Sequence, residues 1–193
     1  MPDSPAPRVA RRLSAVLLGA ALLVPLAACS SEPEPTAKPS QSKTPVAKIF
    51  ETKEEALAAT EASLTAFYDV LGEQGERGGD DPDALREVTA SPATEQSIEY
   101  LSELPDLGVH IQGRTTFYGV KVAEHWQDSD MAHVSAYYCI DSSETRMIDA
   151  SGADVTGKRA EITPALGEFV SVAPEDPRLV LKETSLWRGD NFC

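Results

Sequence analysis

The chain has 193 residues, of which 41% are hydrophobic and 25% charged, and its formal net charge is −14. These proportions are typical of a globular protein with one domain and an additional segment. Residues 1–28 hold three arginines and one aspartate, so the rest of the chain carries 14 basic and 30 acidic residues. Because such an acidic chain repels phosphate backbones, the composition argues against nucleic acid as a partner.

Residues 8–28 have the three parts of a secretory signal. Arg8, Arg11 and Arg12 form a positive segment, an apolar run follows at 13–26, and small residues occupy 27–28. The apolar run is shorter than the roughly 20 residues that a transmembrane helix needs. The pattern therefore favours an export signal over a membrane-spanning anchor.

The end of this signal, Leu26-Ala27-Ala28-Cys29, resembles the lipobox of bacterial lipoproteins. The resemblance implies that residues 1–28 are a signal peptide, that Cys29 carries a diacylglycerol, and that the protein is anchored at the extracytoplasmic face of the cell membrane. Two acyl chains on one cysteine are enough for stable anchoring. An ordinary cleaved signal with an incidental cysteine is the alternative, and Arg11-Arg12 leaves Sec and twin-arginine export both open.

Residues 29–48 contain the lipidated cysteine and a segment rich in Pro, Ser and Thr. This segment has too few apolar side chains to bury a core, so we expect a disordered linker. The linker would hold a folded domain, at residues 49–193, away from the membrane.

Three helices are expected at the start of this domain. Thr52 and Glu55 form a capping box, apolar residues then recur at three- and four-residue spacing, and Gly72 is expected to end the first helix. Asp81-Pro82 predicts the start of a second, short helix. A third helix is expected between Ser91-Pro92 and Pro105.

After Pro105 the sequence is typical of β-structure. Residues 108–126 are strand-like, with bends or bulges at Gly113 and Gly119. Residues 128–130 predict a turn, and residues 131–141 alternate between two faces. A hairpin is expected around Ser151-Gly152, and two further strands at 168–174 and 178–187.

Helices followed by an antiparallel sheet define an α+β domain. The order, with the segments YYCIDSS (137–143), DASGADV (149–155) and LVLKETSLWRGDNFC (179–193), resembles NTF2-like domains of secreted lipoproteins from high-GC Gram-positive bacteria. The resemblance implies an NTF2-like cone, in which three N-terminal helices pack on a curved antiparallel sheet. A cystatin-like or unrelated α+β sheet is the alternative.

With Cys29 assigned to lipidation, Cys139 and Cys193 remain as an even pair in an oxidising compartment, which favours a disulfide. The alternatives are two separate thiols, or a Cys193 that pairs with another chain.

The sequence contains no phosphate loop, dinucleotide fingerprint, nucleophile elbow or close pair of metal ligands, so we expect no cofactor and no metal. The side chains that could line a pocket are Tyr68, Tyr118, His133, Tyr137 and Asp141. Core packing is the alternative role for Tyr68, and a turn with Ser142 and Ser143 is the alternative for Asp141.

We therefore expect a non-catalytic module that binds an envelope protein or a small apolar ligand. NTF2-like folds also host isomerases and cyclases, so a small-molecule enzyme that uses the cone is the alternative, and fold alone does not decide between them. A structural role in an envelope complex is a third hypothesis.

Overall fold

The computed structural model describes residues 47–193, which fall within one compact unit. The predicted signal peptide, Cys29 and most of the predicted linker therefore lie outside the described residues. The described chain folds into α1 (Lys53–Glu76), a 3-10 helix η1 (Pro82–Glu87), α2 (Ala93–Leu107) and the strands β1 (Val109–Gln112), β2 (Thr116–Asp128), β3 (Met131–Asp141), β4 (Arg146–Asp149), β5 (Ile162–Ser171) and β6 (Leu179–Leu186).

Helix α1 begins at the predicted capping box. Thr52 Oγ1 accepts a hydrogen bond from the Glu55 backbone N–H at 3.2 Å, and the Glu55 carboxylate accepts one from the Thr52 N–H at 3.3 Å. The helix does not end at Gly72, as the sequence suggested, and continues to Glu76. A Cβ at Gly72 would overlap the Arg114 side chain, so this glycine provides packing space within the helix.

The expectation of three helices is wrong for the second of them. Residues Pro82–Glu87 form a 3-10 helix without a side-chain cap. The chain must become extended immediately afterwards, because the Leu181 N–H donates to Val88 O at 3.2 Å and the Ala90 N–H donates to Leu181 O at 2.8 Å. The segment thereby covers part of the free edge of β6.

Helix α2 passes through Pro105, where an end was expected, and stops at Gly108. Gly108 has a φ of 65°, the left-handed conformation in which glycine commonly ends a helix. Proline at position 105 cannot donate to the Leu101 carbonyl, and the helix nevertheless continues to Leu107.

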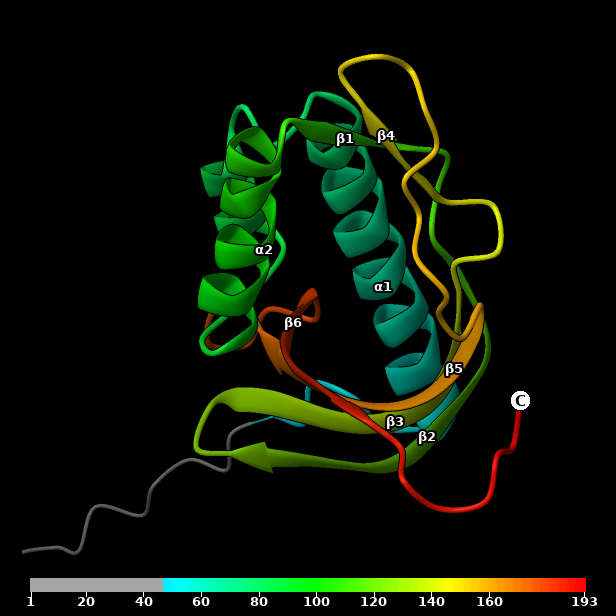
Figure 1. Cartoon of the computed structure of the whole chain (residues 1–193). Coiled ribbons are helices and arrows are strands. Elements are labelled where there is room, and N and C mark those ends of the chain that lie inside the picture. Colours follow the sequence, from blue (N-terminus) through cyan, green and yellow to red (C-terminus); the bar gives the residue numbers. More distant parts are fainter. Residues whose placement is uncertain (1–46) are drawn as a thin grey trace, which may run out of the picture. The chain divides into compact units, whose positions relative to one another are not determined.

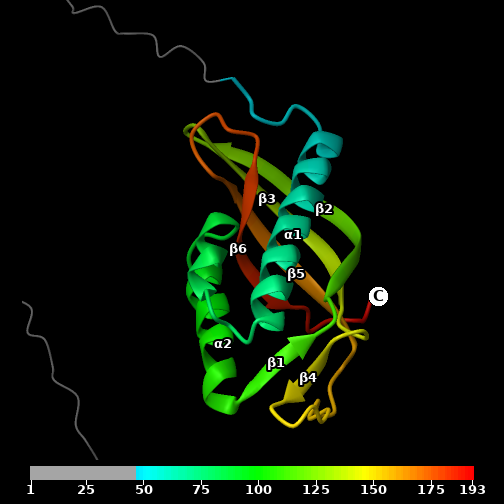
Figure 2. The same cartoon turned by 90° about the horizontal axis from the view of Figure 1, so that it is seen from above.

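All strand pairs in the two sheets are antiparallel (Figures 1 and 2). One sheet has the order β2-β3-β5-β6, and the other pairs β1 with β4. The long strands curve around α1, and the pairing register of β2 shifts between Tyr118 and Lys121, where the sequence suggested a bend or bulge at Gly119. The domain is therefore α+β, with two α-helices on the inner face of the larger sheet.

Strand β3 shows why that inner face is the core. Its residues alternate as predicted: Ala132, Val134, Ala136 and Tyr138 are buried beneath the helices. Gly167 on β5 leaves space for two aromatic rings, since a Cβ there would lie 2.9 Å from the Tyr138 ring and 2.8 Å from the Phe169 ring. The largest fully buried side chains include Tyr138, Phe169, Leu64, Leu85, Leu101, Leu104 and Leu181.

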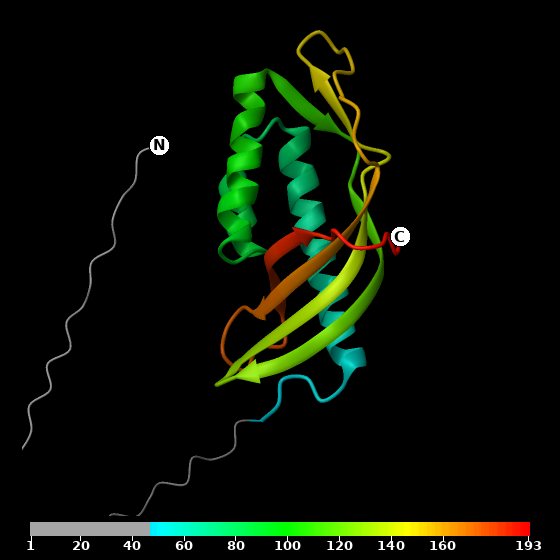
Figure 3. The same cartoon turned by 60° about the horizontal axis from the view of Figure 1, so that its bottom comes forward.

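The C-terminal residues cross the outer face of the sheet (Figure 3). The predicted disulfide is present and joins Cys139 of β3 to Cys193, with 5.8 Å between the Cα atoms. The Trp187 N–H donates to Pro164 O at 2.9 Å, and the Trp187 ring packs edge-on against Tyr137. The disulfide thus fixes the end of the chain to the outer face, opposite the helices.

Candidate functional site

A cavity of about 270 Å³ lies between α1, α2 and the inner face of the larger sheet. A smaller pocket of about 30 Å³ adjoins it and shares several of its lining residues. The cavity is lined by Phe67, Tyr68 and Leu71 from α1, Ala93, Gln96, Ser97 and Tyr100 from α2, and Thr115, Ile140, Ser142, Leu181 and Thr184 from the sheet and its loops.

Hydroxyl groups from three elements meet on one side of this cavity. Tyr138 of β3 is fully buried, and its Oη lies 3.0 Å from Thr184 Oγ1 of β6. Tyr68 of α1 lines the cavity. Burial raises the pKa of Tyr68, and the neighbouring Tyr138 phenol raises it further. Burial also raises the pKa of Tyr138, although its hydrogen bond with Thr184 partly lowers it.

These pKa directions define what the phenols can do. A phenol whose pKa is raised stays protonated at neutral pH, so it can donate a hydrogen bond but cannot accept a proton as a base. Among the described residues, none that lines the cavity is acidic, basic or a histidine. General acid–base catalysis needs a group that titrates near the working pH. The arrangement therefore suits recognition of an uncharged carbonyl or hydroxyl group.

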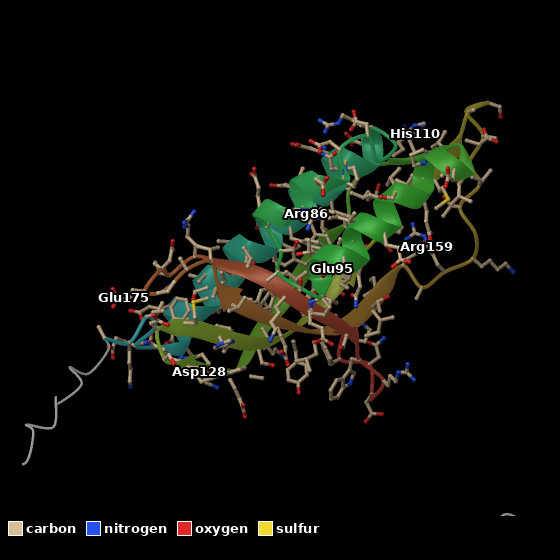
Figure 4. All side chains as sticks on the ribbon, turned by 90° about the vertical axis from the view of Figure 1, so that its left-hand side faces the viewer. Arg86, Glu95, His110, Asp128, Arg159 and Glu175 are labelled. Carbon is tan, nitrogen blue, oxygen red and sulfur yellow. A yellow bond between two sulfur atoms is a disulfide. The ribbon has the colours of Figure 1, made fainter. Side chains whose placement is uncertain are left out.

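Tyr100 forms a partly exposed rim of the cavity. Burial raises its pKa, and the positive charge of Arg159 partly lowers it. Arg159, which lies on the α2 side of the domain (Figure 4), donates to Ser142 O at 2.8 Å and to Thr145 O at 2.6 Å. Its donors thereby hold the loop between β3 and β4 against the cavity, so this cation has a structural role at the rim.

The structure brings only one of the five nominated pocket residues into the cavity, and that residue is Tyr68. Tyr118 is 41% exposed on β2, where it pairs with Cys139. His133 stacks on the Trp126 ring, and Tyr137 packs against the C-terminal residues; both belong to the outer side of β3.

Asp141 also lies outside the cavity. Its carboxylate accepts a hydrogen bond from the Ser143 N–H at 2.9 Å, and this bonding to Ser143 lowers its pKa. The carboxylate therefore forms the turn that the sequence offered as the alternative.

The sequence did not predict four residues that line the cavity: Thr184, Gln96, Ser97 and Tyr100. It also did not predict Tyr138, which is hydrogen-bonded to Thr184. The alternation of β3 contains a signal for Tyr138, because it places this tyrosine on the same face as the buried Val134 and Ala136. No comparable signal exists for the α2 residues, since they lie on a helix with polar side chains around most of its surface.

Within residues 47–193, no group of three or more His, Cys, Asp or Glu side chains is placed to hold a metal ion. The helices in this same range also include none with the length and apolar content needed to cross a membrane.

No family model matches the chain, and no curated protein matches its sequence. Among solved structures, the intermembrane space region of the chloroplast protein ARC6 is 14% identical with a TM-score of 0.49, over 67% of this chain and 95% of that one.

Two further solved structures are also similar. A protein from Catenulispora acidiphila is 14% identical with a TM-score of 0.38, over 70% of this chain and 92% of that one. ActVI-ORFA from Streptomyces coelicolor is 13% identical with a TM-score of 0.36, over 69% of this chain and 99% of that one. These similarities are too weak to identify a family.

Proposed function

We propose that the protein is a lipoprotein, anchored through Cys29 at the extracytoplasmic face of the cell membrane, whose NTF2-like domain binds a small apolar ligand. The lipobox-like Leu26-Ala27-Ala28-Cys29 supports the anchor. The order of helices before a curved antiparallel sheet, with a cavity between them, supports an NTF2-like cone.

The observation that carries the binding function is the chemistry of the cavity wall. Apolar side chains such as Phe67, Ile140 and Leu181 alternate with uncharged hydrogen-bonding groups from Tyr68, Thr184 and Gln96. Ligand sites in proteins combine an apolar lining with a few placed polar groups in this way. The ligand that fits is an uncharged ring or chain compound that carries a carbonyl or hydroxyl group.

Isolation of the lipidated protein from its native membrane, followed by solvent extraction and mass spectrometry, tests this proposal. We expect a small apolar molecule to co-purify with the wild type. The double variant Tyr68→Phe/Thr184→Val should retain about tenfold less of it, because each change removes one hydrogen-bonding group without altering the shape of the cavity.

Tyr118→Phe is the matched control, since it removes an exposed phenol that does not line the cavity. This variant should retain as much ligand as the wild type. Equal recovery from the wild type and the double variant would contradict the proposal. Recovery of a stoichiometric protein partner with no small molecule would favour the protein-binding hypothesis instead.

An enzyme of isomerase or cyclase type is the second candidate, because Tyr68 could polarise a substrate carbonyl by donating a hydrogen bond. Incubation of the recovered molecule with fresh protein separates the two functions. Binding without conversion is expected, whereas a product that the wild type forms and Tyr68→Phe does not would establish the enzyme.

A further inference from the structure

A second hollow, between α1 and the start of β6, shares no lining residue with the cavity described above. This groove has a volume of about 360 Å³ and runs between the first half of α1, the end of η1 and the start of β6. Its lining residues are Ala59, Ala62, Ser63, Ala66, Glu87, Val88, Val172, Pro177, Arg178, Leu179 and Val180. Its volume lies in the range of small-molecule sites, about 300–1,000 Å³.

Ser63 is the unusual residue of this groove. It is only 4% exposed, and its Oγ has no hydrogen-bond partner among the described residues. A buried hydroxyl without a partner destabilises a protein, because its lost hydration is not compensated by a hydrogen bond. Alanine occupies the neighbouring groove positions on α1, so alanine would also fit at position 63 and would remove this cost.

The charges at the groove indicate what kind of molecule would satisfy Ser63. Arg178 forms an ion pair with Asp176, with 2.7 Å between Nη2 and Oδ2, so its charge is already compensated. Glu87 adds a negative charge that disfavours an anionic ligand. The remaining wall consists of aliphatic side chains, which disfavour a charged group of either sign.

We infer that this groove is a second ligand site, which binds an uncharged apolar molecule whose single carbonyl or hydroxyl group pairs with Ser63 Oγ. Ser63 Oγ itself has almost no accessible surface, so its side chain must rotate toward the groove to pair with a ligand. The groove does not depend on the cavity proposed above. Ser63 is a binding residue here, and a bound ligand supplies the hydrogen-bond partner that its hydroxyl lacks.

Titration with 2-naphthol and with naphthalene tests the site, because the two probes differ by one hydroxyl group. Amide chemical shifts of the ¹⁵N-labelled protein report where each probe binds. We expect shifts centred on Ala62, Ser63 and Val180 for both probes. Ser63→Ala should weaken 2-naphthol binding about three- to tenfold and change naphthalene binding less than twofold, since only 2-naphthol loses a hydrogen bond.

Thr65→Ala is the matched control on the same helix. Thr65 Oγ1 already donates to Glu61 O at 2.9 Å, and the residue is exposed away from the groove. Both substitutions raise helix propensity by similar amounts. Ser63→Ala should therefore raise the Tm more than Thr65→Ala does, and only Ser63→Ala should alter 2-naphthol affinity.

Three results would overturn the inference: unchanged 2-naphthol affinity in Ser63→Ala, equal Tm changes in the two variants, or shifts centred on Gln96 and Thr184. The last result would place the probe in the other cavity. Tyr68→Phe should leave the groove titration unchanged, so failure of this site and failure of the proposed function can be told apart.

Discussion

Gly79 shows how one residue can fix the path of the chain after α1. Its φ is +78°, and a Cβ at this position would overlap the carbonyl oxygen of Leu101 on α2. Gly152 has nearly the same backbone conformation, with a φ of +83°, but a Cβ there would meet no atom within 4 Å. Substitution of Gly152 therefore measures the energetic cost of a positive φ alone, whereas substitution of Gly79 adds the cost of a steric overlap.

We predict that Gly152→Ala lowers the free energy of unfolding by about 1 kcal/mol, because alanine tolerates a positive φ poorly. Gly79→Ala should cost about 2–4 kcal/mol, because α2 must also move away from the new methyl group. Urea unfolding of both variants measures the difference. Equal losses would show that the contact between Gly79 and Leu101 is unimportant for stability.

The candidate site was predictable only in part at this scale. The phenol of Tyr68 makes it a candidate pocket residue, and its place in the apolar repeat of α1 also predicts burial. Tyr137 was nominated for the same chemistry, although the alternation of β3 assigns it to the face opposite Tyr138. The cavity is formed by residues from distant parts of the chain, so the pairing of Tyr138 with Thr184 depends on strand order, which the sequence does not state.

At the scale of elements, the sequence predicts the start of a helix or a strand bulge correctly where a single residue or short motif determines it. The Thr52–Glu55 capping box marks the start of α1, and Gly119 marks the bulge of β2. The sequence predicts that α1 ends at Gly72 and α2 at Pro105, and both predictions are wrong, because the helices continue to Glu76 and Leu107. Both lie inside helices here: Arg114 packs on Gly72, and α2 continues past Pro105 to Leu107.

The attachment of the C-terminal segment gives a prediction at the same scale. The disulfide links residues 54 positions apart, and its loss should lower the free energy of unfolding by up to about 4 kcal/mol in the chain-entropy model. Cys139→Ser/Cys193→Ser should also free Trp187 and Phe192 from Tyr137, which a red shift of tryptophan fluorescence would report. The cavity lies on the opposite face of the sheet, so ligand recovery should persist.

Chemical reduction of the wild type is the control for this variant, and it should reproduce both the loss of stability and the fluorescence change. If the variant is as stable as the oxidised wild type, the segment is held by its aromatic contacts and not by the disulfide.

At the scale of the whole molecule, Gln127 of β2 fixes the segment at residues 47–49 to one end of the domain. Its side chain donates from Nε2 to Ala47 O at 3.1 Å and accepts from the Ile49 N–H at 2.9 Å. Asp128 and Glu175 lie at this end of the domain, and His110 lies at the other end (Figure 4). An anchor that precedes Ala47 would therefore hold the domain by the end that carries the turn between β2 and β3.

The predicted anchor at Cys29 and the folded domain are separate parts of the chain. We therefore predict that membrane anchoring and folding can be lost independently. Cys29→Ser should move the protein from the membrane fraction to the soluble fraction, because no acyl chains can be attached, and should leave the Tm of the domain unchanged. Cys193→Ser should do the reverse, lowering the Tm while the protein stays with the membrane. Immunoblots of fractionated cells and detergent-phase partitioning measure the first property, and thermal unfolding measures the second. A Cys29→Ser protein that remains in the membrane fraction and the detergent phase would show that the uncleaved apolar segment at 13–26, or another contact, provides the anchor.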